Sequence, residues 1–308
     1  GVKMLRYTLK RVGVSIITLW VIVTVTFFLM NAIPGDPFTD QKRIPPEIME
    51  KLEKKYGLDQ PLVVQYGRYL KNLLKGDLGI SMKYKNRSVN DIIEEGFKVS
   101  AQVGLMSLVV GATLGILFGI IAALQRGKFF DYFVIIIAVI GVSVPSFVFA
   151  ALFQYVFGVK LKWFPVARWG TPAHYVMPVL ALGIRQIAYI ARMMRTSMLD
   201  VLSQDYVRTA KAKGLSRAAV TWKHTIRNAI LPIVTILGVS IAGVVVGSFV
   251  IESIFAIPGI GKHFVQSITH QDYTLIMGTT VFYATILIVM MFVVDIVYGL
   301  VDPRIRLE

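Results

Sequence analysis

Little in this sequence has the residue types and spacing of a catalytic centre. The string GIGKH, which ends at His263, resembles part of a phosphate-binding loop, yet the first glycine of that pattern falls at Ala256 and a histidine replaces its serine or threonine. The four histidines show no HExxH spacing and no carboxylate cluster, and no GxSxG string is present. Cysteine is absent, which excludes disulfides and thiolate chemistry. We therefore expect no catalytic residue, no metal site and no bound cofactor in this chain.

Three ionisable residues are better candidates, because each lies in or near an apolar run, where a charge is costly. They are Arg185, Glu252 and Asp295. For Glu252 and Asp295 we favour structural pairing, with contact to a transported solute as the alternative. For Arg185 the two interpretations are balanced, because an arginine that faces a central pathway could bind a solute carboxylate through two hydrogen bonds.

The composition is that of a membrane protein. Hydrophobic residues make up 55% of the 308 residues and the mean hydropathy is +0.65, which is more apolar surface than one soluble core needs. Six runs approach or exceed the ~20 residues that a helix needs to cross a bilayer. They are residues 12–33, 99–124, 133–157, 175–194, 230–251 and 275–301. Unpaired backbone groups are costly in lipid and the alternation of barrel strands is missing, so the sequence predicts an all-α membrane protein with six transmembrane helices.

Two prolines and two arginines modify this prediction. Pro145 and Pro178 are expected to kink or end the helices that contain them. The fourth run drifts into Arg192 and Arg195, so we expect its last turn in the interface, with both arginine side chains snorkelling toward water.

Lysine and arginine set the orientation of these spans. With the N-terminus inside, the internal segments hold sixteen of these residues and the two short external loops hold four. Both chain termini, and the segment between the fourth and fifth runs, are therefore expected on the cytoplasmic face. The net charge of +15 follows mainly from this topology, and we expect no nucleic-acid partner.

The external stretch, residues 34–98, carries two amphipathic helical patterns. Pro46 opens the first and Gly57 ends it. Pro61 opens the second, whose tyrosines and leucines gather on one face before Gly76. Two such helices need a surface to lie on. They either cap the membrane part of the chain or receive a partner and gate its entrance.

The segment 205–232 is basic and polar between two apolar runs, and it reads DYVRTAKAKGLSRAAVTWKHTIRNAILP. Val207, Ala210 and Gly214 share one helical face, and Gly214 can take the left-handed conformation that ends a helix. Asp205 suits the positive end of that helix. The small residues allow another surface to approach closely, and the basic side chains steer an acidic one toward the segment.

A second helix is expected to begin directly after the turn. Ser216 is a natural N-cap, and Leu215 and Val220 have the spacing of a hydrophobic staple, which fixes the entry angle of the helix. Pro232 falls in the first turns of the fifth run, where its missing N–H costs little. The pattern predicts a rigid helical lever. The alternative, a basic segment lying on anionic lipid, explains the charge but not the turn.

The strings RTAKAKG and NAILP in this segment resemble the EAA motif of ATP-binding-cassette (ABC) importer permeases, in the longer-spaced form of their dipeptide and oligopeptide branch. The first three motif positions read Arg208, Thr209 and Ala210, so the acidic residue of the general motif is missing. The resemblance covers nearly the whole chain. Further matching strings are LKRVGVSIITLWVIVTVTFFLM, PGDP, YGLDQPLVVQYGRYLKNLLKGDLG, the glutamate before PGIG, DY and the closing DPR.

This resemblance implies a type I ABC importer permease fold in a prokaryotic cytoplasmic membrane. It divides the chain into a first span with its cytoplasmic N-terminus (1–33), an extracytoplasmic helical segment (34–98) and a core permease domain (99–308) that contains the coupling segment (205–232). The residues expected to couple to the ATPase are Asp205, Tyr206, Arg208, Ala210, Lys211, Gly214 and Leu215. The chain itself is expected to be non-catalytic, with ATP and Mg bound by partner subunits.

The resemblance also implies partners and a mechanism. The partners are a second homologous permease subunit, two ABC ATPase subunits, an extracytoplasmic solute-binding protein and the lipid bilayer. Closure of the ATPases on ATP would move the coupling segment as a rigid body and switch a central cavity between inward and outward openings. Dipeptides or oligopeptides are the expected cargo, with oligosaccharides, nickel complexes and opines as alternatives.

Two other classes of protein are less compatible with the sequence. A self-contained ion-coupled transporter or channel would need a file of intramembrane acids, whereas Arg185, Glu252 and Asp295 lie on separate runs. A membrane-anchored scaffold would not need six spans with proline breaks. Co-purification with ATPase and permease partners, together with ATP-dependent uptake, separates these classes.

Overall fold

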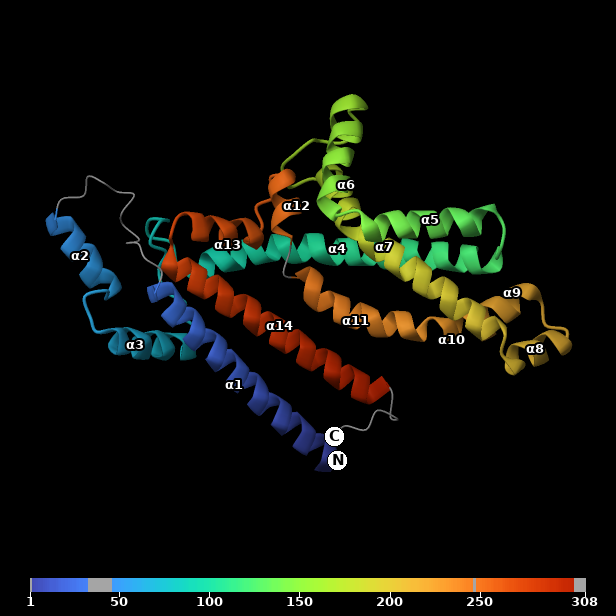
Figure 1. The fold of residues 1–308 in the computed structure, drawn as a ribbon, viewed down its shortest axis with the longest axis horizontal. Helices are drawn as coiled ribbons and strands as arrows, with labels where there is room; N and C mark the ends of the chain where they lie inside the picture. Colours follow the sequence, from blue (N-terminus) through green and yellow to red (C-terminus); the bar gives the residue numbers. More distant parts are fainter. Residues whose placement is uncertain (1, 33–45, 246–247, 302–308) are drawn as a thin grey trace. The chain divides into compact units, whose positions relative to one another are not determined.

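The computed structural model describes residues 2–32, 46–245 and 248–301, and most of them are helical (Figure 1). In chain order the elements are α1 (Val2–Ala32), α2 (Pro46–Tyr56), α3 (Leu62–Leu74), α4 (Val89–Leu124), α5 (Phe129–Ser143), α6 (Ser146–Phe153), η1 (Gln154–Lys160), α7 (Pro172–Leu202), α8 (Asp205–Ala212), α9 (Arg217–Ala219), η2 (Val220–Ile226), α10 (Arg227–Ala229), α11 (Leu231–Val245), α12 (Phe249–Ile254), α13 (Ile260–Thr269) and α14 (Tyr273–Val301). Both η elements are π-helices. Among the described residues, β structure is limited to an isolated antiparallel bridge between Ile80 and Ser88.

Four helices are long and apolar enough to cross a membrane. They are Thr8–Ala32 within α1, the whole of α4, the whole of α7, and Tyr273–Val293 within α14. Each contains or overlaps one of the predicted runs. Pro178 lies inside the 31-residue α7 and does not end it. The helical membrane character of the chain is therefore confirmed for four of the six runs.

The third predicted run, 133–157, does not form one straight helix. α5 ends at Ser143, α6 begins at Ser146, and the two halves are bent by 105°. Val144 is extended, with φ −90° and ψ 128°, the conformation favoured before a proline. The expected break at Pro145 is confirmed, and the bent pair is either a broken span or a re-entrant loop.

The fifth predicted run, 230–251, is also divided. α11 ends at Val245 after 15 residues, and α12 begins at Phe249, with residues 246–247 outside the described part of the chain. At about 1.5 Å per residue, a helix of this length reaches roughly 22 Å, less than the ~30 Å of a hydrocarbon core. By length and composition the described helices thus supply four spans, or five with the bent pair.

The chain divides into two compact units. Among the described residues, unit 1 holds those of Gly1–Gly96 and Lys262–Phe292, and unit 2 holds those of Phe97–Gly261 and Val293–Val301. The first boundary lies close to the one expected at residue 98. The segment Lys262–Phe292, however, groups with the N-terminal residues and not with the expected core domain, because it packs against the loop after α3.

The helices α2 and α3 of unit 1 begin and end where the sequence predicts. α2 starts at Pro46 and is followed by Gly57, which has a φ of +70°. α3 starts directly after Pro61. Gly76 follows its C-terminal turn with a φ of +75°, and its N–H donates to a carbonyl within that turn. The proline and glycine signals were therefore sufficient to place both helices.

α3 packs against the first span. Thr24 and Tyr66 share a hydrogen bond of 2.6 Å between their hydroxyls. The ring of Phe27 lies 5.3 Å from the ring of Tyr66 and 6.0 Å from that of Tyr69. For α3, this contact agrees with the capping interpretation.

Asp272 ties the loop after α3 to the start of α14 within unit 1. Its carboxylate is buried and accepts hydrogen bonds from the Ser81 hydroxyl, from the Met82 N–H at 3.2 Å and from the Leu275 N–H at 3.1 Å. The last of these bonds caps the first turn of α14. This anchor explains why Lys262–Phe292 groups with unit 1.

In unit 2, α4 presents a row of glycines to α7. A Cβ at Gly115 would lie 2.8 Å from the Cβ of Ile190, and one at Gly119 would lie 2.5 Å from the Cβ of Met194. Gly111 makes the same kind of approach one turn earlier. Spacing of four residues keeps these glycines on one helical face, so the two helices pack at close range.

Candidate functional site

The coupling segment begins with α8, which packs inward through a small apolar cluster. Val207 and Ala210 are buried, and they pack with Val220 of η2. Val201 and Leu202 at the end of α7 complete the cluster. The shared face of Val207 and Ala210 is confirmed, but it faces the chain itself. The expectation that Ala210 offers a small surface to a partner is therefore wrong, because Val220 already covers it.

The turn after α8 has the predicted geometry. Gly214 has a φ of +79°, and its N–H donates to the Lys211 carbonyl at 3.0 Å. The Ser216 hydroxyl accepts from the Ala219 N–H at 3.2 Å, so Ser216 is the N-cap of the next helix. The helix–glycine–cap arrangement expected from the sequence is thus confirmed.

The two residues of the predicted hydrophobic staple differ in burial. Leu215 is 43% exposed, while Val220 is buried and packs with α8 and the end of α7. After one turn of α9 the chain winds as the seven-residue π-helix η2, whereas the sequence pattern assumed an α-helix. Trp222 of η2 is 67% exposed.

The far end of the segment is fixed to α7. The Ser197 hydroxyl donates to the Ala229 carbonyl at 2.8 Å. Ile226, Ala229 and Ile233 are buried together with apolar residues of α7, among them Met194. Pro232 is the second residue of α11, as expected. Hydrogen bonding and burial at both ends join α8, η2 and α11 to α7 as one packed body.

The outward face of α8 is polar and aromatic. Tyr206 is 44% exposed, Arg208 lies 3.7 Å from Asp205 in an exposed pair, and Lys211 is exposed. Together with Gly214 and Leu215, six of the seven predicted coupling residues are open to solvent. The seventh, Ala210, supports α8 from beneath.

Glu252 lies at the centre of a buried cluster. Its carboxylate accepts from the Ser100 hydroxyl at 2.6 Å and from the Gly261 N–H at 3.0 Å. The Ser100 hydroxyl in turn accepts from the Ile260 N–H at 2.9 Å. A Cβ at Gly259 would lie 2.4 Å from the carboxyl carbon of Glu252. The turn at Pro258–Gly261 therefore wraps around this carboxylate, in agreement with the structural-pairing interpretation.

The other two candidate pathway residues lie on other helices than Glu252. Arg185 lies on α7, and its side chain is exposed in this chain. Asp295 lies on α14, and its side chain is outside the described residues.

An ion pair in unit 2 was missed from the sequence. Arg195 of α7 binds Asp131 of α5 through two hydrogen bonds, of 2.5 and 2.9 Å. The Asp131 side chain is 3% exposed and that of Arg195 is 21% exposed. The expectation that Arg195 snorkels toward water is therefore wrong, because a buried carboxylate on the neighbouring helix binds it. An aspartate in the first turn of an apolar helix was the signal available, since a buried charge requires a partner.

The sequence matches known families over almost its entire length. The family described as "Binding-protein-dependent transport system inner membrane component" matches residues 115–307, and the family of the corresponding N-terminal component matches residues 4–90. The dipeptide transport system permease DppB of Bacillus subtilis (strain 168) is 50% identical over 305 residues, which cover 99% of both chains. The oligopeptide transport system permease OppB of Haemophilus influenzae is 43% identical over 98% of this chain and 100% of its own.

Two solved structures have a similar fold. An amino acid ABC transporter with histidines superposes with a TM-score of 0.54 at 16% identity, covering 69% of this chain and 95% of that one. The MetNI methionine ABC transporter, in an inward-facing conformation, superposes with a TM-score of 0.53 at 16% identity, covering 68% and 96%. The sequence matches and the shared fold agree, and the chain belongs to the family of binding-protein-dependent transport system inner membrane components.

Proposed function

We propose that this chain is the permease subunit of an ATP-driven, binding-protein-dependent importer of dipeptides or oligopeptides. The observation that carries the proposal is the construction of the coupling segment, in which an exposed helix is packed rigidly onto a long apolar one. The peptide cargo is supported by relatives named for dipeptide and oligopeptide transport that align over nearly the full chain.

The partners follow from the two faces of α8. Its inward face is occupied by Val207 and Ala210, which leaves Tyr206, Arg208 and Lys211 to contact an ATPase subunit on the cytoplasmic side. An aromatic residue flanked by cations suits a groove with an acidic rim. The complex would contain a second permease, two ATPases that bind ATP and Mg, and an extracytoplasmic binding protein. This chain would be non-catalytic.

We further propose six crossings of a prokaryotic cytoplasmic membrane, with both chain termini in the cytoplasm. The bent pair α5 and α6 would supply the third crossing, and α10, α11 and α12 together would supply the fifth. Helical structure from Arg217 through Ala229, continued by α11, supports a crossing longer than α11 alone. The excess of lysine and arginine on one side supports the orientation.

Coupling would work by rigid-body movement. A force on α8 reaches η2 through the packing of Val207 against Val220, and it reaches α7 through Ser197 and Ala229. α7 also carries Arg185, which is exposed in the isolated chain and would be available to a peptide carboxylate. Movement of α7 would thus change access to the cavity and the position of this guanidinium together.

Reconstitution tests the proposal directly. The chain is co-expressed with its partner permease, ATPases and binding protein. The purified complex is placed in proteoliposomes, and ATP is supplied on the side of the membrane that the ATPases face. Uptake of a labelled dipeptide that requires both ATP and the binding protein is the expected result. Uptake of a nickel chelate or an oligosaccharide in place of the peptide would contradict the cargo. Transport by the isolated chain would contradict the class.

A further inference from the structure

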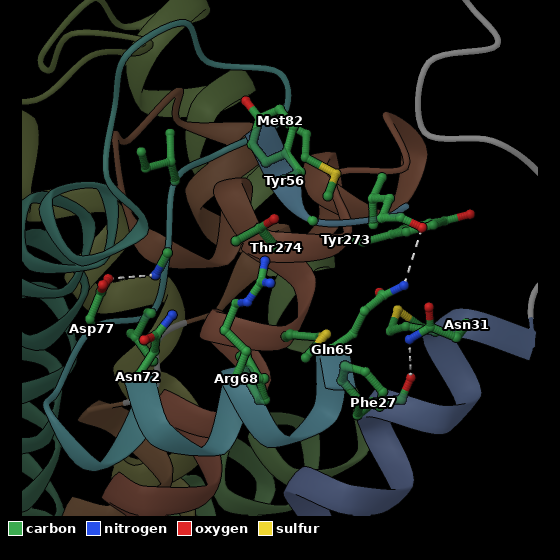
Figure 2. A pocket seen from close by; sticks show the side chains of 18 of the residues that line it. Phe27, Asn31, Tyr56, Gln65, Arg68, Asn72, Asp77, Met82, Tyr273 and Thr274 are labelled. Atoms are coloured by element: carbon green, nitrogen blue, oxygen red, sulfur yellow. Dashed lines mark hydrogen bonds between the residues drawn. The ribbon is translucent and has the colours of Figure 1, made fainter. Parts of the chain in front are cut away.

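Unit 1 contains a pocket of about 300 Å³ between the external helices and two spans (Figure 2). Met30 and Asn31 line it from the last turn of the apolar stretch Thr8–Ala32. Thr274 lines it from the first turn of the apolar stretch Tyr273–Val293. One span ends and another begins at this pocket, which places it at the boundary between lipid and water.

α3 lies at the same boundary. Tyr66 of α3 is hydrogen-bonded to Thr24, which precedes the end of the first span at Ala32 by roughly 12 Å along the helix axis, at about 1.5 Å per residue. Val63 and Leu74, near the two ends of α3, are 76% and 90% exposed. An amphipathic helix packed against the outer third of a span, with apolar side chains left uncovered, is positioned to lie in the membrane interface.

Two cations line the pocket. Arg68 projects from α3 into the pocket and points toward Thr274 (Figure 2). Gly57 leaves the space that the guanidinium occupies, since a Cβ there would lie 2.1 Å from Nη1 of Arg68. Lys55 joins Arg68 from α2. Among the described residues neither cation forms an ion pair, and the one acid of the pocket, Asp77, accepts a hydrogen bond from a backbone N–H of its own loop.

Tyr69 also lines the pocket, and its hydroxyl lacks a partner in the part of the chain that the structure describes. Oη of Tyr69 is buried and makes no hydrogen bond in the described structure. Burial raises the pKa of Tyr69, so the phenol stays protonated and can donate. A buried donor without an acceptor is costly. Next to these polar groups the wall is apolar, with Phe27, Met30, Met82 and Met277.

We propose that this pocket binds the phosphate group of a membrane phospholipid. Arg68 and Lys55 bind the phosphate oxygens, the Tyr69 hydroxyl donates to one of them, and the acyl chains leave along the apolar wall of Met30 and Met277. A free anion would contact the two cations but not the apolar wall. A phospholipid contacts both, the cations through its phosphate group and the wall through its acyl chains. The inference does not depend on the cargo of the transporter. The lipid would belong to the outer leaflet of the membrane, and this placement alone rests on the topology proposed above.

The test measures lipid bound to the purified, complete transport complex by native mass spectrometry. Dioleoyl phosphatidylglycerol is titrated into the wild type, Arg68→Gln and Lys71→Gln. Lys71 lies on the same helix and is exposed, but it does not line the pocket, so it is the matched control. We expect Arg68→Gln to weaken the tightest binding event about tenfold, as loss of a charge-assisted hydrogen bond predicts, and Lys71→Gln to leave it unchanged.

A second variant separates binding from folding. Tyr69→Phe removes only the unpartnered hydroxyl, so the lipid-free complex should keep or slightly raise its melting temperature while phosphatidylglycerol binds about fivefold more weakly. Equal losses in Arg68→Gln and Lys71→Gln would mean diffuse surface charge and would overturn the site. Displacement of the lipid by millimolar inorganic phosphate, or by the transported peptide, would overturn the headgroup assignment. Binding of phosphatidylethanolamine with the same dependence on Arg68 would support a phosphodiester as the recognised group.

Discussion

Gly214 and Gly259 both lie in short turns of unit 2, but glycine is required at the two positions for different reasons. Gly214 has a φ of +79°, and a Cβ built on it meets nothing within 4 Å, so only the backbone conformation restricts the residue. Gly259 has no positive φ, but a Cβ there would lie 2.4 Å from the carboxyl carbon of Glu252 and 2.5 Å from the hydroxyl of Ser100. Gly214 is therefore required for its backbone conformation, and Gly259 is required because it leaves room for the side chains of Glu252 and Ser100.

The two turns also differ in how far along the chain their determining residues lie. The turn at Gly214 is specified by its neighbours along the chain, since Ser216 caps the next helix and α8 ends just before the glycine. The turn at Gly259 is specified by Ser100, which is 152 residues away from the Glu252 that it binds. A substitution at Gly214 should therefore change one bend, and a substitution at Gly259 should disrupt the packing of separate helices.

The largest effect is expected for Gly259→Ala. The added methyl group must displace the Glu252 carboxylate or the Ser100 hydroxyl, and both are buried and hydrogen-bonded. Overpacking and the loss of these bonds together should lower the free energy of unfolding by about 3 kcal/mol or more. The measurement is the thermal stability and assembly yield of the purified complex.

Gly67→Ala is the control for this prediction. Gly67 lies in α3 and a Cβ built there meets nothing within 4 Å, so alanine should be neutral or should stabilise the helix by up to about 1 kcal/mol. Similar melting temperatures for Gly259→Ala and wild type would show that the turn around Glu252 can move aside, and the distinction between the two turns would then fail.

A smaller effect is expected for Ser100→Ala. This change removes one hydrogen bond to the Glu252 carboxylate and leaves the Ile260 N–H without its acceptor. We expect a loss of about 2 kcal/mol, since bonds to charged groups are worth more than neutral ones. Combining Ser100→Ala with Glu252→Gln in a double-mutant cycle should give a loss well below the sum of the single losses. Additive losses would mean that the two side chains do not act together.

The sequence was sufficient for features that depend on neighbouring residues. Pro46, Gly57 and Pro61 placed α2 and α3, and Gly214 with Ser216 placed the turn of the coupling segment. Proline and glycine restrict the backbone wherever they occur, and a serine before a helix acts within one turn. Such signals do not require knowledge of the fold.

Features that depend on distant residues were predicted incompletely. Arg195 was expected to reach water, but its partner Asp131 comes from a separate helix whose packing no local pattern reports. The π-helix η2 was not expected, since periodicity arguments assume an α-helix. Ala210 was correctly placed on the face of Val207, but the side of the helix on which the rest of the chain would pack could not be decided from the spacing.

Gly214→Val should affect coupling more than stability. A β-branched residue at this φ costs about 2 kcal/mol, and the exposed turn can relieve that strain by changing its bend. α8 would then be misdirected while the buried helices stay packed. We expect normal assembly, near-normal ATP hydrolysis and a large decrease in peptide transported per ATP. Gly214→Asn is the matched control, because asparagine adds a side chain to the same open space but tolerates the left-handed conformation.

The smallest effect is expected for Ser216→Ala, which leaves the glycine in place and removes only the cap. The Ser216 hydroxyl accepts from the Ala219 N–H at 3.2 Å at an exposed position, so its loss should cost about 1 kcal/mol, confined to α9. Faster amide hydrogen exchange at Ala219, with unchanged exchange in α7, is the measurement. Ser216→Asp should restore protection because it keeps an acceptor at the helix N-terminus. If Ser216→Ala instead lowered the melting temperature as much as Gly259→Ala, the turn of the coupling segment would be part of the long-range packing and not a local bend.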